Sequence, residues 1–410
     1  MSLKTSQAWT ALTRARGARR RHRRSGVALL VVMTTITILT VIVTELSYTA
    51  RVRFLVAAHE RERAQAYWIS QTGINFYRLI LTTNKQMEGN SALAGISASM
   101  GVNLGDGLWQ MLPFFNTGLL RMVFAGGGDV DDVDEEELDE FKKTGAVSEE
   151  VEEASREGGL FSDRNFLDFE GDFSAEVKDE DSKLNLSLLG ATTGSIQESA
   201  IGQQLYGLMS GEEHDQWFRD KDIDRWEIIA NLKDWVDVDG DRSGTSGGYE
   251  DALYNNLESP YLSKNAPLDT FDEIRLVEGW QDDVMDRFGD QLTIHGVGKV
   301  NVNTASDEVL TALIKAYVSP PPSDFECLRA LEQIREYMLL TNFKDGKDFA
   351  QYLTTQGYTV SDQLAGQLGD SSKTFKVTST GMVGSSVVTT TAIIDYSQSN
   401  AGQTIYWRVD

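Results

Sequence analysis

The feature that most constrains this chain is a run of eighteen uncharged residues, 27–44, rich in Val, Ile and Leu. A helix of that length is about 27 Å long, which is just enough to cross the hydrocarbon core of a membrane. Lys4 and seven arginines precede the run, and no acidic residue does. Because such basic residues stay on the cytoplasmic side, we expect one transmembrane segment, residues 27–45, with the rest of the chain carried across the membrane.

The junction between the basic leader and the apolar run is open to three interpretations. A cleaved secretory signal would have a shorter apolar centre and an Ala-x-Ala site, which this chain lacks, and a plain signal anchor would need no special junction residue. Here the leader, residues 1–26, ends at Gly26 and the run begins at once at Val27. This junction resembles the leader of the type IV pilin and pseudopilin class, in which a prepilin peptidase cuts after the glycine and the new terminus is usually methylated. Most members carry Glu at the fifth mature position, where this chain has Val31.

The composition restricts the possible partners of the body. The chain has 410 residues, enough for two or three domains, and a formal net charge of −24. Removal of a leader with eight basic residues would make the remainder still more acidic, with a charge of −32. Such a body repels nucleic acid and suits divalent cations. The single cysteine, Cys327, cannot form an internal disulfide, so a core or bound metal must hold an exported fold together.

The pattern along the chain predicts an α+β body with a helical insertion. Residues 46–182 are expected to form a stem helix, continuous with the transmembrane segment, and the first part of a sheet, with a half-exposed strand at 166–177. Strand patterns return in the last segment, 373–410. Between them lie two stretches with helical periodicity, 183–298 and 299–372, which open with the similar phrases Lys-Leu-Asn-Leu-Ser and Lys-Val-Asn-Val-Asn. Residues 126–158 contain fourteen acidic and three basic residues, and we expect a disordered acidic insert there.

An Asp-rich stretch in the first helical region is the best candidate for a metal site. Its candidate ligands are Asp237, Asp239, Asp241, Glu250 and Asp251. The first three resemble the start of an EF-hand loop, but Arg242 and Gly248 stand where that loop needs Gly and Glu. Hard oxygen donors on a Gly-rich loop would favour Ca²⁺ in an irregular site. A solvated acidic turn explains the same residues equally well.

No catalytic constellation is visible in the sequence. The four histidines are scattered without zinc-ligand spacing, and no nucleophile elbow, phosphate loop or dinucleotide fingerprint is present. Gly296-Val-Gly298 is similar to the start of helix-hairpin-helix DNA-binding modules, but three prolines, 320–322, stand where the Gly-rich hairpin should follow. A non-enzymatic protein is therefore expected. A membrane-anchored calcium-binding or DNA-uptake-type protein is the alternative kept open, and an exported enzyme is disfavoured because no site supports it.

Eight segments together resemble the general secretion pathway protein K family, the large minor pseudopilin of type II secretion. They are residues 26–32, 65–68, 181–186, 234–239, 248–251, 265–279, 300–305 and 406–408. The resemblance implies a type IV pilin-like fold, in which a long N-terminal transmembrane helix packs on an antiparallel sheet interrupted by two inserted SAM-like helical modules. It also implies a bound calcium ion near the Asp-rich loop, an inner-membrane anchor with a periplasmic body, and no enzymatic activity. The family lacks the fifth-position Glu, as this chain does.

The same resemblance implies the partners and the place of this chain in an assembly. Members cap the tip of a pseudopilus together with I- and J-type minor pseudopilins, above the major pseudopilin, after processing by the prepilin peptidase. A tip subunit has no neighbour ahead whose amine needs a carboxylate, which accounts for Val31. The partner-binding part of the stem is expected to be an apolar stripe at helical spacing: Ala64, Tyr67, Ile74, Tyr77 and Leu81.

Overall fold

The computed structural model describes residues 5–88, 107–120, 170–191, 194–244 and 247–410. The acidic insert expected at 126–158 lies outside these residues, so that expectation remains a prediction. The chain divides into two compact units, one formed by residues 1–65 with 383–386 and the other by residues 66–382 with 387–410.

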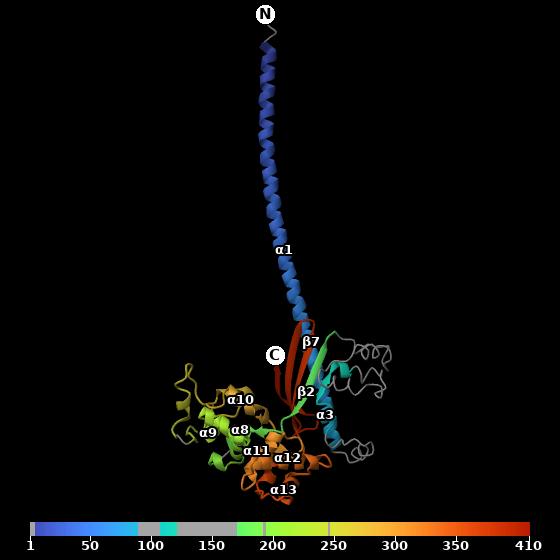
Figure 1. Cartoon of the computed structure of the whole chain (residues 1–410). Coiled ribbons are helices and arrows are strands. Elements are labelled where there is room, and N and C mark those ends of the chain that lie inside the picture. The colour runs from blue at the N-terminus through green and yellow to red at the C-terminus, as the bar shows by residue number, and fades with distance from the viewer. Residues whose placement is uncertain (1–4, 89–106, 121–169, 192–193, 245–246) are drawn as a thin grey trace, which may run out of the picture. The chain divides into compact units, whose positions relative to one another are not determined.

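Helix α1, Thr5–Glu88, is the longest element and runs through both units (Figure 1). Its part from Gly26 is long and apolar enough to cross a membrane, as the sequence predicts, with a mean hydropathy of 2.6 over the most apolar window. The threonines of this part do not leave free hydroxyl donors, because each donates to a carbonyl about one turn earlier. They are Thr34, Thr35, Thr37, Thr40 and Thr44.

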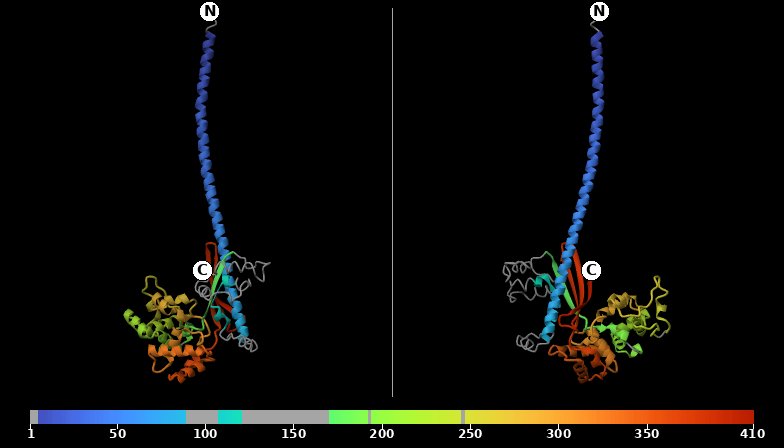
Figure 2. Two further views of the ribbon diagram at one scale, coloured as in Figure 1. Left: turned by 45° about the vertical axis from the view of Figure 1, so that its right-hand side comes forward. Right: turned by 180° about the vertical axis from the view of Figure 1, so that it is seen from behind.

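In the second unit, the end of α1 packs against a five-stranded sheet with the order β1-β2-β7-β8-β9 (Figure 2). The strands are β1 Phe114–Asn116, β2 Asp172–Asp179, β7 Thr374–Val383, β8 Ser386–Asp395 and β9 Gln403–Val409. The β1–β2, β2–β7 and β8–β9 pairs are antiparallel. The alternating apolar patterns predicted near residue 177 and after residue 375 therefore form one sheet, although almost two hundred residues of sequence separate them.

Two glycines allow the helix to approach the sheet closely. A Cβ on Gly73 of α1 would come within 2.3 Å of Ser379 Oγ, and a Cβ on Gly381 of β7 within 2.1 Å of the Ala66 carbonyl oxygen. Around this contact, Ser70 Oγ and Thr390 Oγ1 lie 2.7 Å apart in the core. Gly is therefore required on both surfaces, because any side chain would separate the layers.

The predicted stripe on the stem is mostly used within the chain itself. Ile74, Tyr77 and Leu81 are at most 3% exposed, and Tyr77 Oη donates to the Leu112 carbonyl. Ala64 is exposed and Tyr67 half-buried. The expectation that the whole stripe contacts a partner is therefore corrected for these three residues, whose side chains are buried under the sheet of their own chain. Periodicity identified an apolar face but could not tell which surface covers it.

The segment between β2 and β7 is a helical insertion. Its α-helices are α7 Ala200–Leu208, α8 Glu212–Lys221, α9 Arg225–Val236, α10 Asp282–Phe288, α11 Asp307–Tyr317, α12 Asp324–Met338, α13 Gly346–Thr355 and α14 Leu364–Gln367. Buried apolar side chains from Leu184 to Leu368 form one continuous cluster. Helices α7 and α11 cross closely, since a Cβ on Gly207 would lie 2.4 Å from the Ala312 carbonyl oxygen. The two predicted helical regions thus share a core.

The two similar opening phrases form equivalent structures. Strand β3, Leu184–Asn185, pairs in parallel with β4, Leu292–Thr293, and strand β5, Val300–Asn301, pairs in parallel with β6, Leu368–Gly369. In each phrase the Asn side chain accepts a hydrogen bond from the backbone N–H two residues later. Each helical region therefore begins and ends at a short parallel pair, which explains why the phrase recurs.

A buried polar junction joins the insertion to the sheet at the end of β2. Asp181 accepts hydrogen bonds from the backbone N–H groups of Val297, Lys373 and Thr374 at 2.7–3.0 Å. Asp179 Oδ1 accepts from the backbone N–H of Asp181, and its Oδ2 from two hydroxyls. Because these donors come from the segment between the two helical regions and from the return to β7, the junction holds three passes of the chain together.

Candidate metal centre

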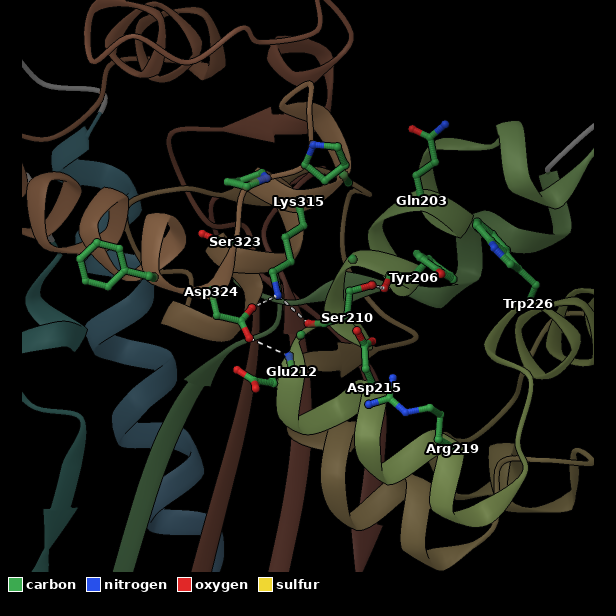
Figure 3. A pocket seen from close by; sticks show the side chains of 16 residues that line it. Gln203, Tyr206, Ser210, Glu212, Asp215, Arg219, Trp226, Lys315, Ser323 and Asp324 are labelled. Atoms are coloured by element: carbon green, nitrogen blue, oxygen red, sulfur yellow. Dashed lines mark hydrogen bonds and ion pairs between the residues drawn. The ribbon is translucent and has the colours of Figure 1, made fainter.

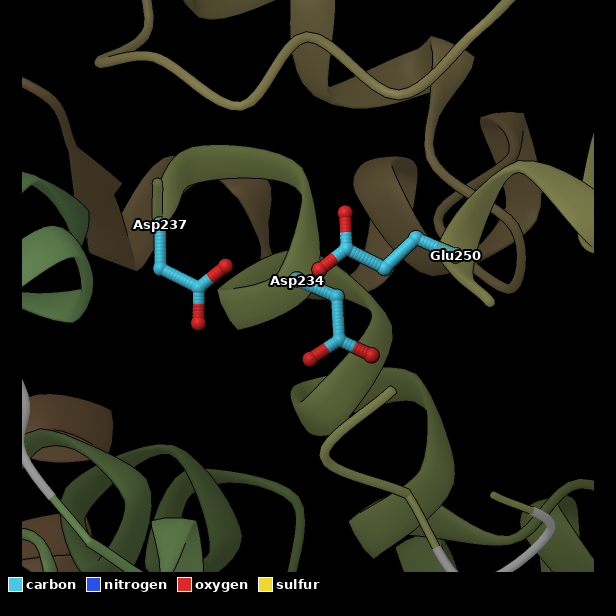
Figure 4. A group of neighbouring side chains, drawn as sticks. All are labelled: Asp234, Asp237 and Glu250. Carbon is cyan, nitrogen blue, oxygen red and sulfur yellow. The ribbon is translucent and has the colours of Figure 1, made fainter. Parts of the chain in front are cut away.

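Three carboxylates converge at the end of α9 (Figure 4). Asp234 lies in the last turn of this helix and Asp237 is its C-cap residue, and a separation of three residues puts both on one face. Glu250 begins the short helix η5, Glu250–Leu253, after the Asp-rich loop. Each of the three offers a carboxylate oxygen, and these oxygens all lie within 4.8 Å of one another.

The cluster is buried and incompletely satisfied. Asp234, Asp237 and Glu250 are only 3%, 7% and 2% exposed. The Asp234 oxygens accept from the Ser243 backbone N–H at 2.9 and 3.0 Å. By contrast, both carboxylate oxygens of Glu250 and Oδ1 of Asp237 have no hydrogen-bond partner among the described residues. Buried acceptors without a donor are costly, so a set of this kind is suited to binding a cation.

The net charge of the cluster also favours the binding of a cation. Lys233 Nζ lies 2.7 Å from Asp237 Oδ2 and is itself buried, so it neutralises one of the three carboxylates. Two negative charges are left, which is the charge that one divalent cation would compensate. Without a cation, burial and, to a smaller extent, the neighbouring Asp237 and Asp234 carboxylates raise the pKa of Glu250 to about 7. Burial also raises the pKa of Asp234.

The donor set and its spacing fit calcium. Ca²⁺ binds oxygen ligands at about 2.3–2.6 Å, so two ligands of one ion lie up to about 5 Å apart, which matches the cluster. An all-oxygen set without His or Cys disfavours zinc and the other metals that prefer nitrogen or sulfur. The Asn265 side chain lies beside the loop, since its Nδ2 donates to the Asp239 carbonyl at 2.8 Å, and its buried Oδ1 has no partner among the described residues.

The structure brings together only two of the five ligands expected from the sequence, Asp237 and Glu250. Asp239 and Asp241 are exposed, and the Asp239 carboxylate accepts from the Asp241 backbone N–H within the turn. Asp251 Oδ1 instead accepts from the N–H and hydroxyl of Ser263, both at 2.9 Å. Asp234, which the structure places in the cluster, is not among the ligands predicted from the sequence. Its helical spacing from Asp237 is a signal that could have indicated it, whereas the alternation of 237, 239 and 241 favours the exposed loop.

A cavity of about 670 Å³ lies elsewhere in the insertion, where α7, α8, α11 and α12 meet (Figure 3). Lys315 Nζ donates to the Ser210 carbonyl at 2.7 Å and to Asp324 Oδ1 at 2.5 Å. The other Asp324 oxygen accepts from the Glu212 backbone N–H. These bonds tie the first helical region to the second, so the charged groups of this cavity serve packing, and we assign it no ligand.

The fold defines a class of protein: an α+β protein whose sheet is interrupted by a helical insertion and whose long N-terminal helix is apolar enough to serve as a membrane anchor. Residues 182–295 match the family model described as type II secretion system protein K. This segment is therefore similar to the protein K family, the family that the sequence motifs resemble, and it contains the whole candidate metal centre.

The crystal structure of the GspK–GspI–GspJ complex from the type 2 secretion system of enterotoxigenic Escherichia coli is similar over 59% of this chain and 80% of the matched chain. The sequence identity is 21% and the TM-score 0.47. No curated protein matches the chain.

Proposed function

We propose that this chain is a minor pseudopilin that caps the tip of a type II secretion pseudopilus and so supports protein export across the outer membrane. The observation that carries the proposal is the protein K family match over residues 182–295. Among the described residues, one helix near the N-terminus is long and apolar enough to cross a membrane, and this supports the proposal, as does the absence of a carboxylate at position 31. The chain is anchored in the inner membrane with a cytoplasmic N-terminus and a periplasmic body.

The precursor is processed between Gly26 and Val27 by a prepilin peptidase, which leaves Val27 as a methylated terminus. The support is the sequence junction itself, where a basic leader meets the apolar run at a glycine. A Cβ built on Gly26 meets no atom within 4 Å. A larger residue at this position would therefore not disturb the folded chain, so a processing defect in such a variant would be a defect of recognition.

Calcium is the cofactor, held by Asp234, Asp237 and Glu250. Asn265 Oδ1 and carbonyl groups of the loop are candidates for the remaining positions, because Ca²⁺ takes six to eight oxygen ligands. The ion would neutralise the two uncompensated charges and satisfy the three unpaired oxygens. It would thereby tie the end of α9 to the start of η5 and close the Asp-rich loop between them.

The partners are I- and J-type minor pseudopilins, with the major pseudopilin below them. The exposed side of the stem is better suited to contact them than the buried stripe. Trp68 and Leu79, both 64% exposed, lie on the side of α1 away from the sheet. Together with Ala64 and Thr72 they follow helical spacing, so they form one line along the outside of the stem.

The test is complementation of a strain that lacks its protein K with the full chain, followed by purification of the complex from membranes and imaging of the filament end. We expect restored secretion, co-purification of the I- and J-type proteins, and this chain at the tip alone. Regular spacing of this chain along the filament shaft would contradict the cap function. Restored secretion without either partner would contradict the proposed complex.

A further inference from the structure

Lys233 is a buried basic residue within the carboxylate cluster. It lies in the last turn of α9, four residues before Asp237, and is only 6% exposed. A lysine is rarely buried to this extent unless a partner compensates its charge. Its Nζ donates to Asp237 Oδ2 and to the Ser243 hydroxyl, both at 2.7 Å. The side chain is therefore held in place by the same helix and loop that form the cluster.

The ammonium group of Lys233 satisfies only part of the cluster. It contacts one oxygen of Asp237, whereas Asp237 Oδ1 and both carboxylate oxygens of Glu250 have no hydrogen-bond partner in the part of the chain that the structure describes. Because Oδ2 of Asp237 is already in use, this residue offers a single free oxygen to an ion. The lysine therefore accompanies a cation in this cluster and does not replace it.

Two other basic side chains near the Asp-rich loop pair with carboxylates outside the cluster. Arg242 Nη2 donates to Glu227, and Lys264 Nζ lies 2.8 Å from Glu273. Among the described residues, Lys233 makes the one ion pair to the three clustered carboxylates. Three negative charges and its one positive charge leave a net charge of −2. The removal of Lys233 alone would change this charge to −3.

The net charge of such a site influences which ion it prefers. The Coulomb energy scales with the product of the two charges, so one additional negative charge strengthens the attraction for a trivalent ion about one and a half times as much as for a divalent ion. The number of ligand charges and the rigidity of the site also set the calcium affinity of oxygen sites. With Lys233 present, the cluster is less attractive to every cation, and the reduction is largest for trivalent ions.

We propose that Lys233 is a specificity-determining residue of the metal centre, whose ammonium group limits the charge of the site so that a divalent ion competes better with a trivalent ion. The inference rests on the calcium centre of the proposed function. It also gives the lysine a role before any ion binds, because three buried carboxylates without a cation repel one another and Lys233 offsets one of them. The residue thus lowers the affinity for cations and stabilises the metal-free chain.

The test compares Ca²⁺ with La³⁺, a trivalent ion of similar radius, on the full chain in detergent. The melting temperature is measured against the concentration of each ion, and the concentration that gives half of the stabilisation is the midpoint. Asp234→Asn supplies the background from cations bound elsewhere on this acidic chain. We expect Lys233→Met to lower the La³⁺ midpoint at least about tenfold more than the Ca²⁺ midpoint, and to lower the melting temperature without added metal.

Two further variants separate the charge of the lysine from its packing. Lys233→Arg keeps the charge, so the ratio of the two midpoints should remain that of the wild type. Lys183→Met removes another partly buried lysine, which lies 3.0 Å from Glu180 outside the cluster. This matched control should lower the melting temperature and leave the ratio unchanged.

The outcomes distinguish the proposal from the calcium centre on which it rests. An unchanged ratio in Lys233→Met, or the same change in Lys233→Arg, would overturn the role of Lys233 while leaving the calcium centre intact. If neither ion stabilises the wild type more than it stabilises Asp234→Asn, the calcium centre is wrong and the proposal fails with it.

Discussion

At the candidate metal centre, the effect of each residue depends on whether its carboxylate is buried. Calcium at a hundredfold excess over its dissociation constant should add about 2.7 kcal/mol to the free energy of unfolding. Asp234→Asn should abolish this gain, because Asp234 is one of the three converging ligands. Asp241→Asn is the matched control and should retain it, since Asp241 is exposed.

The measurement is denaturation of the full chain in detergent, with calcium and with a chelator. Magnesium should stabilise less than calcium, because an irregular carboxylate site does not provide its near-ideal octahedral geometry. If Asp241→Asn loses the calcium effect and Asp234→Asn keeps it, the ligand set read from the exposed loop is correct and the buried cluster is not the site.

Asp179 at the junction predicts a pH dependence of stability. Burial raises its pKa to about 6, so the folded state holds this proton at a pH where the unfolded state has lost it. The proton on Asp179 therefore adds most to the free energy of unfolding at low pH. This stabilisation is lost as the pH rises from about 4 to 6. At roughly 1.4 kcal/mol for each pH unit, it amounts to up to about 3 kcal/mol.

Asp179→Asn isolates that contribution. Its amide can still accept from the Asp181 N–H and can donate to the hydroxyls of Thr304 and Ser372, so the junction should survive. We expect the variant to be less sensitive to pH than the wild type between pH 4 and 6, measured by chemical denaturation with calcium present. Identical pH profiles would show that Asp179 titrates normally.

At the scale of elements, the two sides of the stem should respond differently to substitution. Ile74 is 3% exposed under the sheet, so Ile74→Asp buries an unpaired charge and should cost several kcal/mol of stability. Trp68 is 64% exposed on the other side, and Trp68→Asp should leave the melting temperature nearly unchanged while weakening partner recovery. Thermal melting and co-purification, measured on the same samples, separate the two effects. A folded Ile74→Asp variant would contradict the packing of α1 on the sheet.

At the scale of the whole molecule, processing determines whether the precursor or the shortened chain enters the assembly. We expect mass spectrometry of the membrane-extracted protein to find a terminus at Val27, carrying one additional methyl group. Gly26→Val should leave the full-length precursor in the membrane with its secondary structure intact, because the change meets no folded neighbour. A terminus beyond residue 44 would instead indicate an ordinary secretory signal.

The sequence by itself determined what local patterns encode. Hydropathy and charge asymmetry predicted the apolar helix at 27–44, and unbroken helical periodicity predicted its continuation as a stem. Strand alternation on both sides of a helical region predicted an interrupted sheet, and the eight motifs indicated the family. These features depend on residues that are only a few positions apart in the chain, so the sequence alone is enough to predict them.

Only the tertiary structure decided which faces are occupied. It buried Ile74 and Tyr77 under the chain's own sheet, because β2 and β7 return to α1 from far along the sequence. It joined two helical regions with recurring openings into one core, and it placed Asp234, rather than the exposed Asp239 and Asp241, beside Asp237 and Glu250. Burial is set by contacts between distant segments, and it determines whether a carboxylate is a solvated charge or a ligand.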